Sequence, residues 1–467
     1  MTITTTPIKF GTDGWRGIMA RDFTSSNVRT VAQAISEFVK GRPKLKGIPI
    51  VVGYDRRFGS PSFAEEIACI LKGNRLNPVL LEEVLPTPAI SYLTHRNTGL
   101  GIMVTASHNP ASYNGIKIKM EGRAVPEAVT KEVESLLNKG SIAKEGSPNR
   151  KSFKDVYLSY LRSKIPPAAI ARKLNRPAVI DYMYGCAAGL LEEVLPSKKL
   201  IPLHTKHDPL FGGLHPEPIE KYLTELMESV RKNKAIIGIA LDGDADRIGL
   251  VDDKGQYLTP CQVFPLLLQY MIEQKKLKGK IVQSVSMGYL SSRIAKAYGL
   301  PFEEVPVGFK HIAEKILTEN AVMGGEESGG YAWKGVLPER DGLLTALLFL
   351  EMLTETRKTP SQLYQAIEKK YGASYFVRKD FRLHKPIPDK NVFAEKLKKK
   401  LPKKILSSVI QDVKTMDGIK IILEKDHWLL LRPSGTEPLI RTYAETDSLK
   451  KTNELLEAGA KMIKQLI

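Results

Sequence analysis

The sequence has few cysteines and no long uncharged hydrophobic run. The three cysteines, Cys69, Cys186 and Cys261, are widely spaced, which excludes a disulfide framework and a zinc-binding pattern. Residues 1–7 are threonine-rich and lack the apolar core of a signal peptide. The most apolar stretch, residues 343–353, contains Glu351 and is too short to cross a bilayer, so it predicts a core helix. These absences favour a reducing, cytoplasmic setting with no membrane partner.

Acidic residues are in the minority. The chain has 51 acidic and 70 basic side chains, a net charge of +19 and a pI near 9.5. Such a charge favours anionic ligands, either nucleic acid or phosphorylated small molecules. No nucleic-acid motif or arginine–aromatic platform is present, and lysine runs such as 396–400 are typical of a solvated helix face. We therefore expect no nucleic-acid partner, although a basic nucleic-acid binder is the alternative that charge alone supports.

The length and the pattern of the chain predict several domains. A chain of 467 residues is too long for one ordinary core. Short apolar runs alternate with helical spacing up to about Gly372, which predicts doubly wound α/β sheets. Beyond Gly372, strand-like runs bracketed by helices predict an α+β domain. A glycine-, serine- and charge-rich segment at 139–150 marks the first boundary, and the expected domains are 1–148, 149–253, 254–372 and 373–467.

A serine lies on a sharp loop at the end of a predicted strand. Ser107 follows the apolar run 102–104, and Asn109-Pro110 then interrupts regular structure. Ligands of open α/β sheets bind at the carboxyl ends of strands. We therefore predict that Ser107 is a nucleophile that carries a phosphoryl group, with a plain turn as the alternative. The strand-like run 115–118 brings Lys117 close to Ser107 in sequence.

Three aspartates alternate after another predicted strand. Asp242, Asp244 and Asp246 can turn their oxygens toward one hard cation. An EF-hand is excluded because Arg247 and Asp253 stand where it needs glycine and glutamate, and because 248–251 is strand-like. Without a cation the clustered carboxylates would repel one another. We predict one Mg²⁺ site, with a solvated turn as the alternative.

Three further loops offer polar side chains. Arg16 lies in the glycine-rich stretch 9–17, which predicts an irregular loop where it could clamp a phosphate, or a surface turn. Glycines at 324–330 surround Glu326, Glu327 and Ser328, whose oxygens suit sugar hydroxyls, although such loops are often plain turns. The stretch 432–438 with Arg441 resembles either a phosphate cradle or a polar hairpin loop.

Four of these loops, in this order, carry a family resemblance. Residues 105–110, 242–247, 325–329 and 432–438 are similar to motifs of the α-D-phosphohexomutase superfamily, which includes phosphoglucomutases and phosphomannomutases. The resemblance extends from Phe10 to the C-terminal helix. It implies a heart-shaped, four-domain architecture with three related α/β mixed-sheet domains and a C-terminal α+β domain. A fourth domain that hinges open is expected.

The resemblance also implies roles for individual residues. Ser107 matches the phosphoserine, and a phosphoserine oxygen would join the three aspartates in holding magnesium. His108 and Lys117 match the candidate acid and base, and Lys117 is the preferred base provided that neighbouring cations lower its pKa. Arg16 and Arg247 fall near the phosphoserine. The implied substrate contacts are Glu326 and Ser328 for sugar hydroxyls and Arg432, Ser434, Gly435 and Thr436 for the distal phosphate. Lys310 and Arg441 are further candidate substrate contacts.

The implied activity is reversible conversion of glucose 1-phosphate to glucose 6-phosphate, with glucose 1,6-bisphosphate as intermediate and activator. Glu327 favours glucose, because phosphoglucosamine mutases usually have glutamine there and bifunctional phosphomannomutases often have methionine. Gly330 departs from the histidine that is frequent in bacterial enzymes. The alternatives are a glucose 1,6-bisphosphate synthase, a phosphomannomutase or bifunctional mutase, and a non-catalytic sugar-phosphate sensor. Hexose phosphates are the expected partners of a monomer or homodimer.

Overall fold

The structure is a computed structural model that describes residues 7–11, 13–97, 99–435 and 437–466. It has two compact units: unit 1 contains Met1–Leu258 and Ser328–Ser361, and unit 2 contains Thr259–Glu327 and Gln362–Ile467. Within the described ranges, every helix is too short or too polar to cross a bilayer. The predicted boundaries at 148, 253 and 372 stay predictions.

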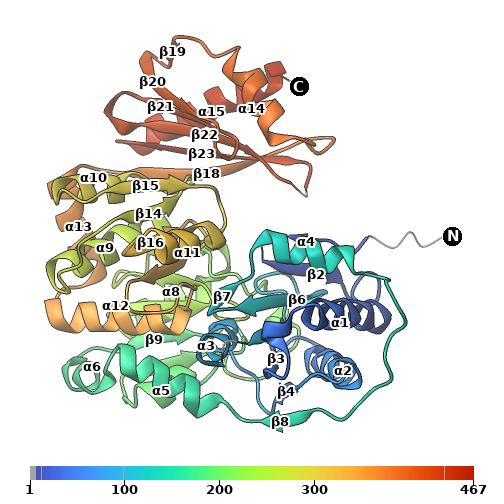
Figure 1. Cartoon of the computed structure of the whole chain (residues 1–467). Helices are drawn as coiled ribbons and strands as arrows, with labels where there is room; N and C mark the ends of the chain where they lie inside the picture. Colours follow the sequence, from blue (N-terminus) through green and yellow to red (C-terminus); the bar gives the residue numbers. More distant parts are fainter. Residues whose placement is uncertain (1–6, 12, 98, 436, 467) are drawn as a thin grey trace. The chain divides into compact units, whose positions relative to one another are not determined.

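The first sheet of unit 1 has a doubly wound part. Strand β3 (Ile50–Tyr54) lies between β4 (Pro78–Leu81) and β5 (Leu100–Val104), and all three are parallel. Helix α2 (Ser60–Gly73) connects β3 to β4, and α3 (Thr87–Asn97) connects β4 back past β3 to β5, so the two crossovers run in opposite directions along the sheet. Because such crossovers are right-handed, α2 and α3 cover opposite faces of the sheet (Figure 1). The carboxyl ends of β3 and β5 therefore lie next to each other.

The other elements of this sheet make it mixed. Strand β6 (Tyr113–Met120) is antiparallel to β5, and β8 (Asn149–Lys151) is parallel to β4. Short strand β7 (Arg123–Ala124) pairs with β6. Helix α1 (Ser25–Lys40) packs against α2, and α4 (Glu127–Ser135) packs against α1. This arrangement confirms the expected mixed α/β class.

The irregular loop predicted for residues 9–17 is wrong. Strands β1 (Phe10–Gly11) and β2 (Gly14–Ile18) pair there, and β2 continues the sheet by pairing antiparallel with β6. Gly14 has φ of +102°, which a side chain rarely adopts. A Cβ on Gly17 would come within 2.9 Å of the Cβ of Asp22. The glycines therefore permit a tight turn and a close approach inside a strand.

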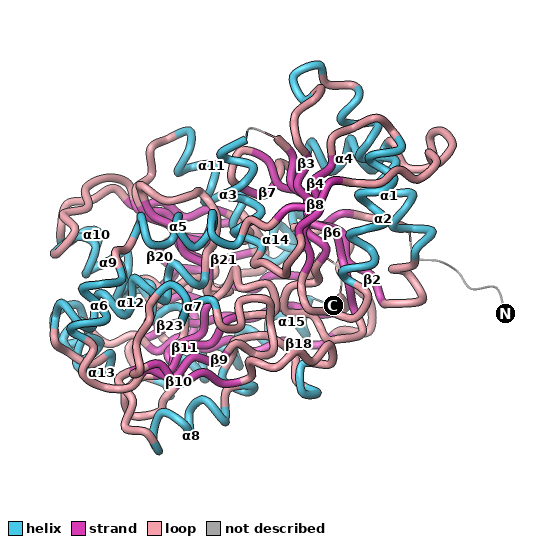
Figure 2. Tube along the Cα trace, turned by 90° about the horizontal axis from the view of Figure 1, so that it is seen from below, coloured by secondary structure: helices cyan, strands magenta, loops and turns pink. Residues whose placement is uncertain are grey.

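The second sheet of unit 1 carries the aspartate loop. Its order is β10 (Leu200–Leu203), β9 (Ala178–Asp181), β11 (Ile237–Leu241), β12 (Ile248–Val251) and β13 (Tyr257–Leu258). The first three strands are parallel and lie side by side (Figure 2), whereas β12 and β13 are antiparallel. Unit 1 also contains α5 (Lys154–Lys164), α6 (Pro167–Lys173), α7 (Leu190–Val194), α8 (Thr224–Lys232) and β17 (Gly330–Trp333). Strand β12 directly follows the aspartate loop, as expected.

The most apolar stretch is a core helix, as predicted. Helix α12 (Gly342–Thr356) is buried along most of its length. Asp341 caps its first turn by accepting the Leu344 N–H at 2.9 Å. The Tyr157 hydroxyl donates to the same carboxylate at 3.0 Å. Burial raises the pKa of Asp341 to about 7.

Asp341 therefore makes stability depend on pH. Its pKa is higher in the folded than in the unfolded state, so the folded protein keeps the Asp341 carboxyl protonated up to a higher pH. The free energy of unfolding therefore falls as pH rises from about 4 to about 7. Asp341→Asn keeps an oxygen that can cap the helix but has no carboxyl group to titrate. Between pH 4 and pH 8, the free energy of unfolding of the variant should rise relative to that of the parent by at most about 4 kcal/mol. Thermal unfolding at both pH values measures this.

Asp389→Asn is the matched control, because Asp389 caps α14 (Lys390–Lys398) at an exposed helix start. Because Asp389 is exposed, the stability difference between this variant and the parent should change much less between pH 4 and pH 8 than that of Asp341→Asn. Equal stability of Asp341→Asn and the parent at pH 4 and at pH 8 would contradict the prediction.

Unit 2 begins with a parallel sheet. Strand β14 (Ile281–Ser284) pairs in parallel with β15 (Phe302–Val305) and β16 (Met323–Glu326). The helices of this part are α9 (Pro260–Glu273), α10 (Leu290–Ala297) and α11 (Phe309–Thr318), and α13 (Pro360–Tyr371) enters unit 2 at Gln362.

The rest of unit 2 is an antiparallel sheet with helices on one face, which confirms the expected α+β class. The strand order is β18 (Tyr375–Arg382), β23 (Leu439–Thr446), β22 (Trp428–Pro433), β21 (Ile419–Leu423), β20 (Ser408–Lys414) and β19 (Lys404–Ile405). Helices α14 and α15 (Leu449–Leu466) cover one face, where Phe393 and Leu455 pack with Leu431 in the core.

Buried polar contacts join the two sheets of unit 2. Lys420 of β21 donates to Glu304 at 2.6 Å and to the Val285 carbonyl at 2.8 Å. Its Nζ lies 4.1 Å and 3.9 Å from the ring centres of Tyr289 and Trp428. Breaking a buried ion pair is costly, since it leaves an uncompensated charge. The expected opening of the fourth domain, if its sheet moved alone, would have to break these contacts.

Candidate active site

The loop after β5 points Ser107 at the aspartates. The Ser107 hydroxyl donates to Oδ2 of Asp242 at 2.8 Å, and Nδ1 of His108 lies 3.4 Å from the same hydroxyl oxygen. Ser107 is fully buried and has φ of +55°. This left-handed conformation is uncommon outside glycine, and such strained residues are concentrated at functional sites.

The three aspartates form a buried cluster whose ligand oxygens lie within 4.8 Å of one another. Oδ1 of Asp244 and Oδ1 of Asp246 have no hydrogen-bond partner among the described residues. Burial, together with Asp244 and Asp246, raises the pKa of Asp242 well above its usual range. Buried carboxylate oxygens normally have partners, so these oxygens fit a divalent cation. The cluster is thus consistent with the predicted metal site.

Lys117 reaches the same cluster from β6. Its Nζ lies 2.8 Å from Asp13, 2.8 Å from Asp244 and 3.0 Å from Asp246. Burial opposes the lysine charge, but these three carboxylates raise the pKa of Lys117 above its ordinary value. Lys117 could act as the general base only if neighbouring cations lowered its pKa. Its neighbours are mainly anions, so this condition is not met. Lys117 is a fixed cation beside the aspartates.

His108 has the opposite electrostatic environment. Burial, followed by Arg247 and Arg16, holds the pKa of His108 well below its usual value, so the imidazole is neutral at neutral pH. Burial and then Arg247 also lower the pKa of the Arg16 guanidinium. Arg16 donates to the Asn109 side chain at 2.7 Å, which places it against the serine loop. Two neighbouring, partly exposed guanidinium groups fit an anion such as a phosphoryl group.

The sequence did not single out several residues of this network. Asp13 contacts Lys117, Lys119 at 3.3 Å and Arg340 at 3.0 Å. Although burial opposes its charge, these three cations hold the pKa of Asp13 well below the usual range. Arg340 also lies 2.6 Å from Asp246. Asp13 stood in the glycine-rich stretch already noted, whereas nothing in the spacing indicated Arg340.

The predicted sugar contacts are placed as follows. In unit 2, Glu326 ends β16 and is buried, and Lys310 lies in the first turn of α11. Ser328 is the first residue of the unit 1 segment Ser328–Ser361. The neighbouring carboxylate of Glu327 lies 3.0 Å from the guanidinium of Arg378 on β18.

The predicted phosphate loop is the connection between β22 and β23, so it is also a hairpin loop. Arg432 and Arg441 are direct cross-strand partners. Like charges in such a pair are destabilising without counter-ions. Here Asp417 lies 2.7 Å from Arg432, and Glu437 lies 3.1 Å from Arg441.

The remaining residues of this loop suit an anion. The Ser434 hydroxyl accepts the Glu437 N–H at 3.2 Å. Gly435 is exposed, with open space where a Cβ would stand. Thr436 lies outside the described residues. The loop thus presents exposed backbone between two arginines.

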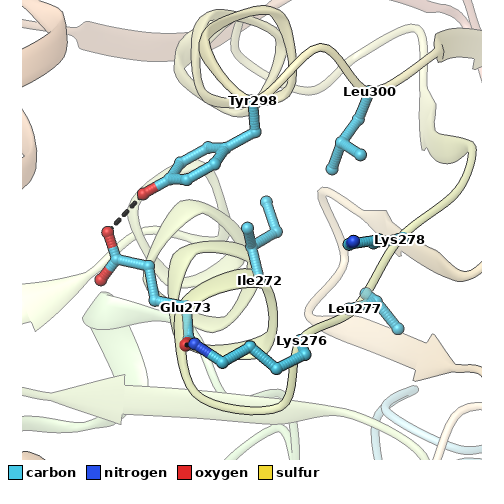
Figure 3. A pocket seen from close by; sticks show the side chains of 7 residues that line it. All are labelled: Ile272, Glu273, Lys276, Leu277, Lys278, Tyr298 and Leu300. Carbon is cyan, nitrogen blue, oxygen red and sulfur yellow. Dashed lines mark hydrogen bonds between the residues drawn. The ribbon is translucent and has the colours of Figure 1, made fainter.

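A separate surface pocket of about 350 Å³ lies in unit 2 (Figure 3). Its lining consists of Ile272, Glu273, Lys276, Leu277, Lys278, Tyr298 and Leu300. The Tyr298 hydroxyl donates to Glu273 across one end. The lining includes none of the predicted site residues.

Comparisons with known proteins agree with this geometry. Four descriptions of phosphoglucomutase/phosphomannomutase domains match: alpha/beta/alpha domain I at residues 7–144, domain II at 155–255, domain III at 259–371 and the C-terminal domain at 391–462. A phosphoglucosamine/phosphogalactosamine mutase of Sulfurisphaera tokodaii is 31% identical over 97% of this chain and 98% of its own. A phosphoglucomutase/phosphomannomutase of Thermococcus kodakarensis is 29% identical over 98% and 99%.

A solved structure shows the same architecture. The crystal structure of a Thermus thermophilus protein, which bears a phosphomannomutase name, superimposes with a TM-score of 0.87. The two sequences are 31% identical, and the match covers 99% of this chain and 100% of that one. The chain therefore has the four-domain α/β architecture, belongs to the α-D-phosphohexomutase superfamily and is an enzyme of the intramolecular phosphotransferase type.

Proposed function

We propose that this enzyme is a magnesium-dependent phosphoglucomutase that interconverts glucose 1-phosphate and glucose 6-phosphate. The observation that carries the proposal is the strained Ser107, whose hydroxyl donates to Asp242 inside a buried cluster of three carboxylates. An exposed serine turn would need neither feature. The proposal extends to glucose 1,6-bisphosphate as the intermediate.

The chain's own groups account for the phosphoryl transfer. Phosphorylated Ser107 gives its phosphoryl group to the free hydroxyl of the hexose phosphate, so the Oγ–P bond breaks and a sugar O–P bond forms. Neutral His108 takes the hydroxyl proton and returns it to the Ser107 oxygen, 3.4 Å from its Nδ1. Arg16 and Arg247 hold the anionic group in place. The bisphosphate then reorients, and its other phosphoryl group moves to Ser107 by the reverse step.

The aspartate cluster would hold the metal ion. Oxygens of Asp242, Asp244 and Asp246 supply three carboxylate ligands, and Mg²⁺ accepts such ligands together with phosphate oxygens. When bound, the ion neutralises charge on the transferred phosphoryl group. Lys117 fixes Asp244 and Asp246 from the side of β6.

Two observations bear on the sugar. Glu327 is already neutralised by Arg378 at 3.0 Å, so it attracts a C2 ammonium group less than a free carboxylate does, which supports glucose. The name of the Sulfurisphaera tokodaii relative instead favours glucosamine phosphates, which are the second candidate. Mannose 1-phosphate is a further alternative supported by the relative from Thermococcus kodakarensis.

A coupled assay tests the proposal. Glucose 1-phosphate, glucosamine 1-phosphate and mannose 1-phosphate are each supplied with Mg²⁺, with and without a trace of glucose 1,6-bisphosphate. We expect glucose 1-phosphate to give the highest kcat/KM, with stimulation by the trace of bisphosphate. Accumulation of free bisphosphate in place of the 6-phosphate would support a synthase instead. Failure to convert any of the three sugars would refute the mutase activity.

A further inference from the structure

Four backbone carbonyls, three in the loop after β5 and one at the first residue of β6, converge on a single buried side chain. Nη2 of Arg57 donates to the carbonyls of Ser107 and Asn109, each at 2.6 Å. Nη1 donates to the carbonyls of Pro110 at 2.7 Å and Tyr113 at 3.1 Å. The Arg57 side chain has an exposed fraction of 0%. Arginine is rarely fully buried, so a buried guanidinium whose donors bind backbone carbonyls indicates a specific structural contact.

Arg57 is itself held from two sides. Its Nε lies 3.2 Å from Oδ2 of Asp55, and its guanidinium carbon lies 4.9 Å from the centre of the Phe211 ring. Asp55 also accepts the Arg57 N–H at 3.0 Å and the Ser60 hydroxyl at 2.7 Å. Both residues follow β3, whose carboxyl end lies beside that of β5. Arg57 is therefore held by residues outside the loop to which its guanidinium donates.

A second arm leads from Asp55 to the serine. The Thr105 hydroxyl donates to Oδ2 of Asp55 at 2.6 Å and accepts the Ser107 N–H at 2.9 Å. Ser107 is thus held by its carbonyl through Arg57 and by its N–H through Thr105. A Cβ placed on Gly243 would lie 2.5 Å from the Ser107 carbonyl oxygen, so the serine loop closely approaches the aspartate loop.

We propose that Arg57 is a positioning residue for the phosphoryl-carrying serine, an inference that rests on the proposed mutase function. Its two terminal nitrogens hold Ser107 in the left-handed conformation that points Oγ at Asp242. Arg57 itself contacts no reacting atom. Only a guanidinium offers a planar fork that reaches four carbonyls, because an ammonium has three donors at one point. The residue therefore sets the geometry of transfer rather than the affinity for the sugar phosphate.

The test compares Arg57→Lys with Arg56→Lys. Arg56 is the adjacent residue, but its guanidinium donates to the Thr205 carbonyl at 2.8 Å and not to the serine loop. A misplacement of about 1 Å costs roughly 10²-fold in rate. For Arg57→Lys we expect kcat to fall about 10- to 100-fold with KM within about twofold of the parent. Arg56→Lys should retain the kcat and KM of the parent.

Hydrogen exchange gives a readout that is independent of turnover. The amides of Ser107, Asn109 and Tyr113 are bonded within the loop and should exchange faster in Arg57→Lys, whereas amides of β12 should not change. If Arg57→Lys does not fold, Thr105→Val replaces it, because it removes the hydroxyl that holds the Ser107 N–H. The same fall in kcat and faster exchange at Ser107 are then expected.

Unchanged kcat and unchanged exchange in Arg57→Lys, or in Thr105→Val when it takes its place, would overturn the proposal. A lowered Tm with unchanged kcat well below that Tm would also overturn it, because Arg57 would then only stabilise the fold. If the parent protein converts no hexose phosphate, the mutase function fails, while the exchange of the loop amides still decides whether Arg57 holds Ser107.

Discussion

Replacement of Ser107 by alanine is expected to abolish turnover and to leave the fold intact. Alanine lacks the oxygen that carries the phosphoryl group, and loss of a covalent nucleophile costs at least about 10³-fold in kcat. The fold should persist because the loop is held through the Ser107 backbone: Thr105 accepts its N–H, and Arg57 donates to its carbonyl. The coupled assay measures turnover, and circular dichroism measures folding.

Mass spectrometry supplies the second half of this prediction. The parent protein incubated with glucose 1,6-bisphosphate should carry phosphate on Ser107, and Ser107→Ala should carry none. Ser112→Ala is the matched control, since Ser112 lies in the same loop, is exposed and uses its backbone carbonyl to accept the Met19 N–H. This control should be phosphorylated and active like the parent. Phosphate found only on another residue, or more than about a tenth of the parent activity in Ser107→Ala, would refute the mechanism.

Asp242→Asn should separate metal binding from folding. Burial and the neighbouring Asp244 and Asp246 raise the pKa of Asp242, so a neutral amide relieves repulsion in the metal-free protein. The same change removes an anionic metal ligand. We expect the metal-free variant to unfold at a Tm no lower than that of the parent. Its kcat with Mg²⁺ should be roughly 10²- to 10³-fold lower, since a catalytic metal ion contributes several kcal/mol.

Ligand-linked stabilisation checks the metal site without an activity measurement. Adding Mg²⁺ after chelator treatment should raise the Tm of the parent protein, because an ion that binds only the folded state stabilises it. The Tm of Asp242→Asn should not respond. Asp252→Asn is the control: Asp252 is buried in the turn after β12, where it accepts the Gln256 N–H at 2.8 Å, and this variant should respond like the parent. An equal Mg²⁺ response in Asp242→Asn would contradict the proposed ligand set.

Sequence reasoning identified candidate side chains where the chemistry is local. The alternating carboxylates at 242–246 and the strand-end serine each predict a site from adjacent residues, and the structure brings them together. Helix α12 was likewise predicted from its apolar composition, and the C-terminal α+β sheet from its strand-like runs bracketed by helices. The stretch 9–17 was misread because glycine usually indicates a loop. Here it permits β2 to approach Asp22 closely, a reason that local spacing does not contain.

The sequence by itself therefore determined the family and the fold class, and it supplied candidate residues for the site. Only the tertiary structure decided which side chains share an electrostatic environment. The sequence made Lys117 a candidate base. In the structure it contacts Asp13, which lies far earlier in the chain, and two aspartates that follow a strand of another sheet, and these carboxylates raise its pKa. In the sequence, Arg57 is one of several charged residues after a predicted strand. Because β3 and β5 are adjacent in the sheet, its guanidinium reaches the serine loop. Charge interactions and hydrogen bonds depend on distance in space, which sequence separation does not encode.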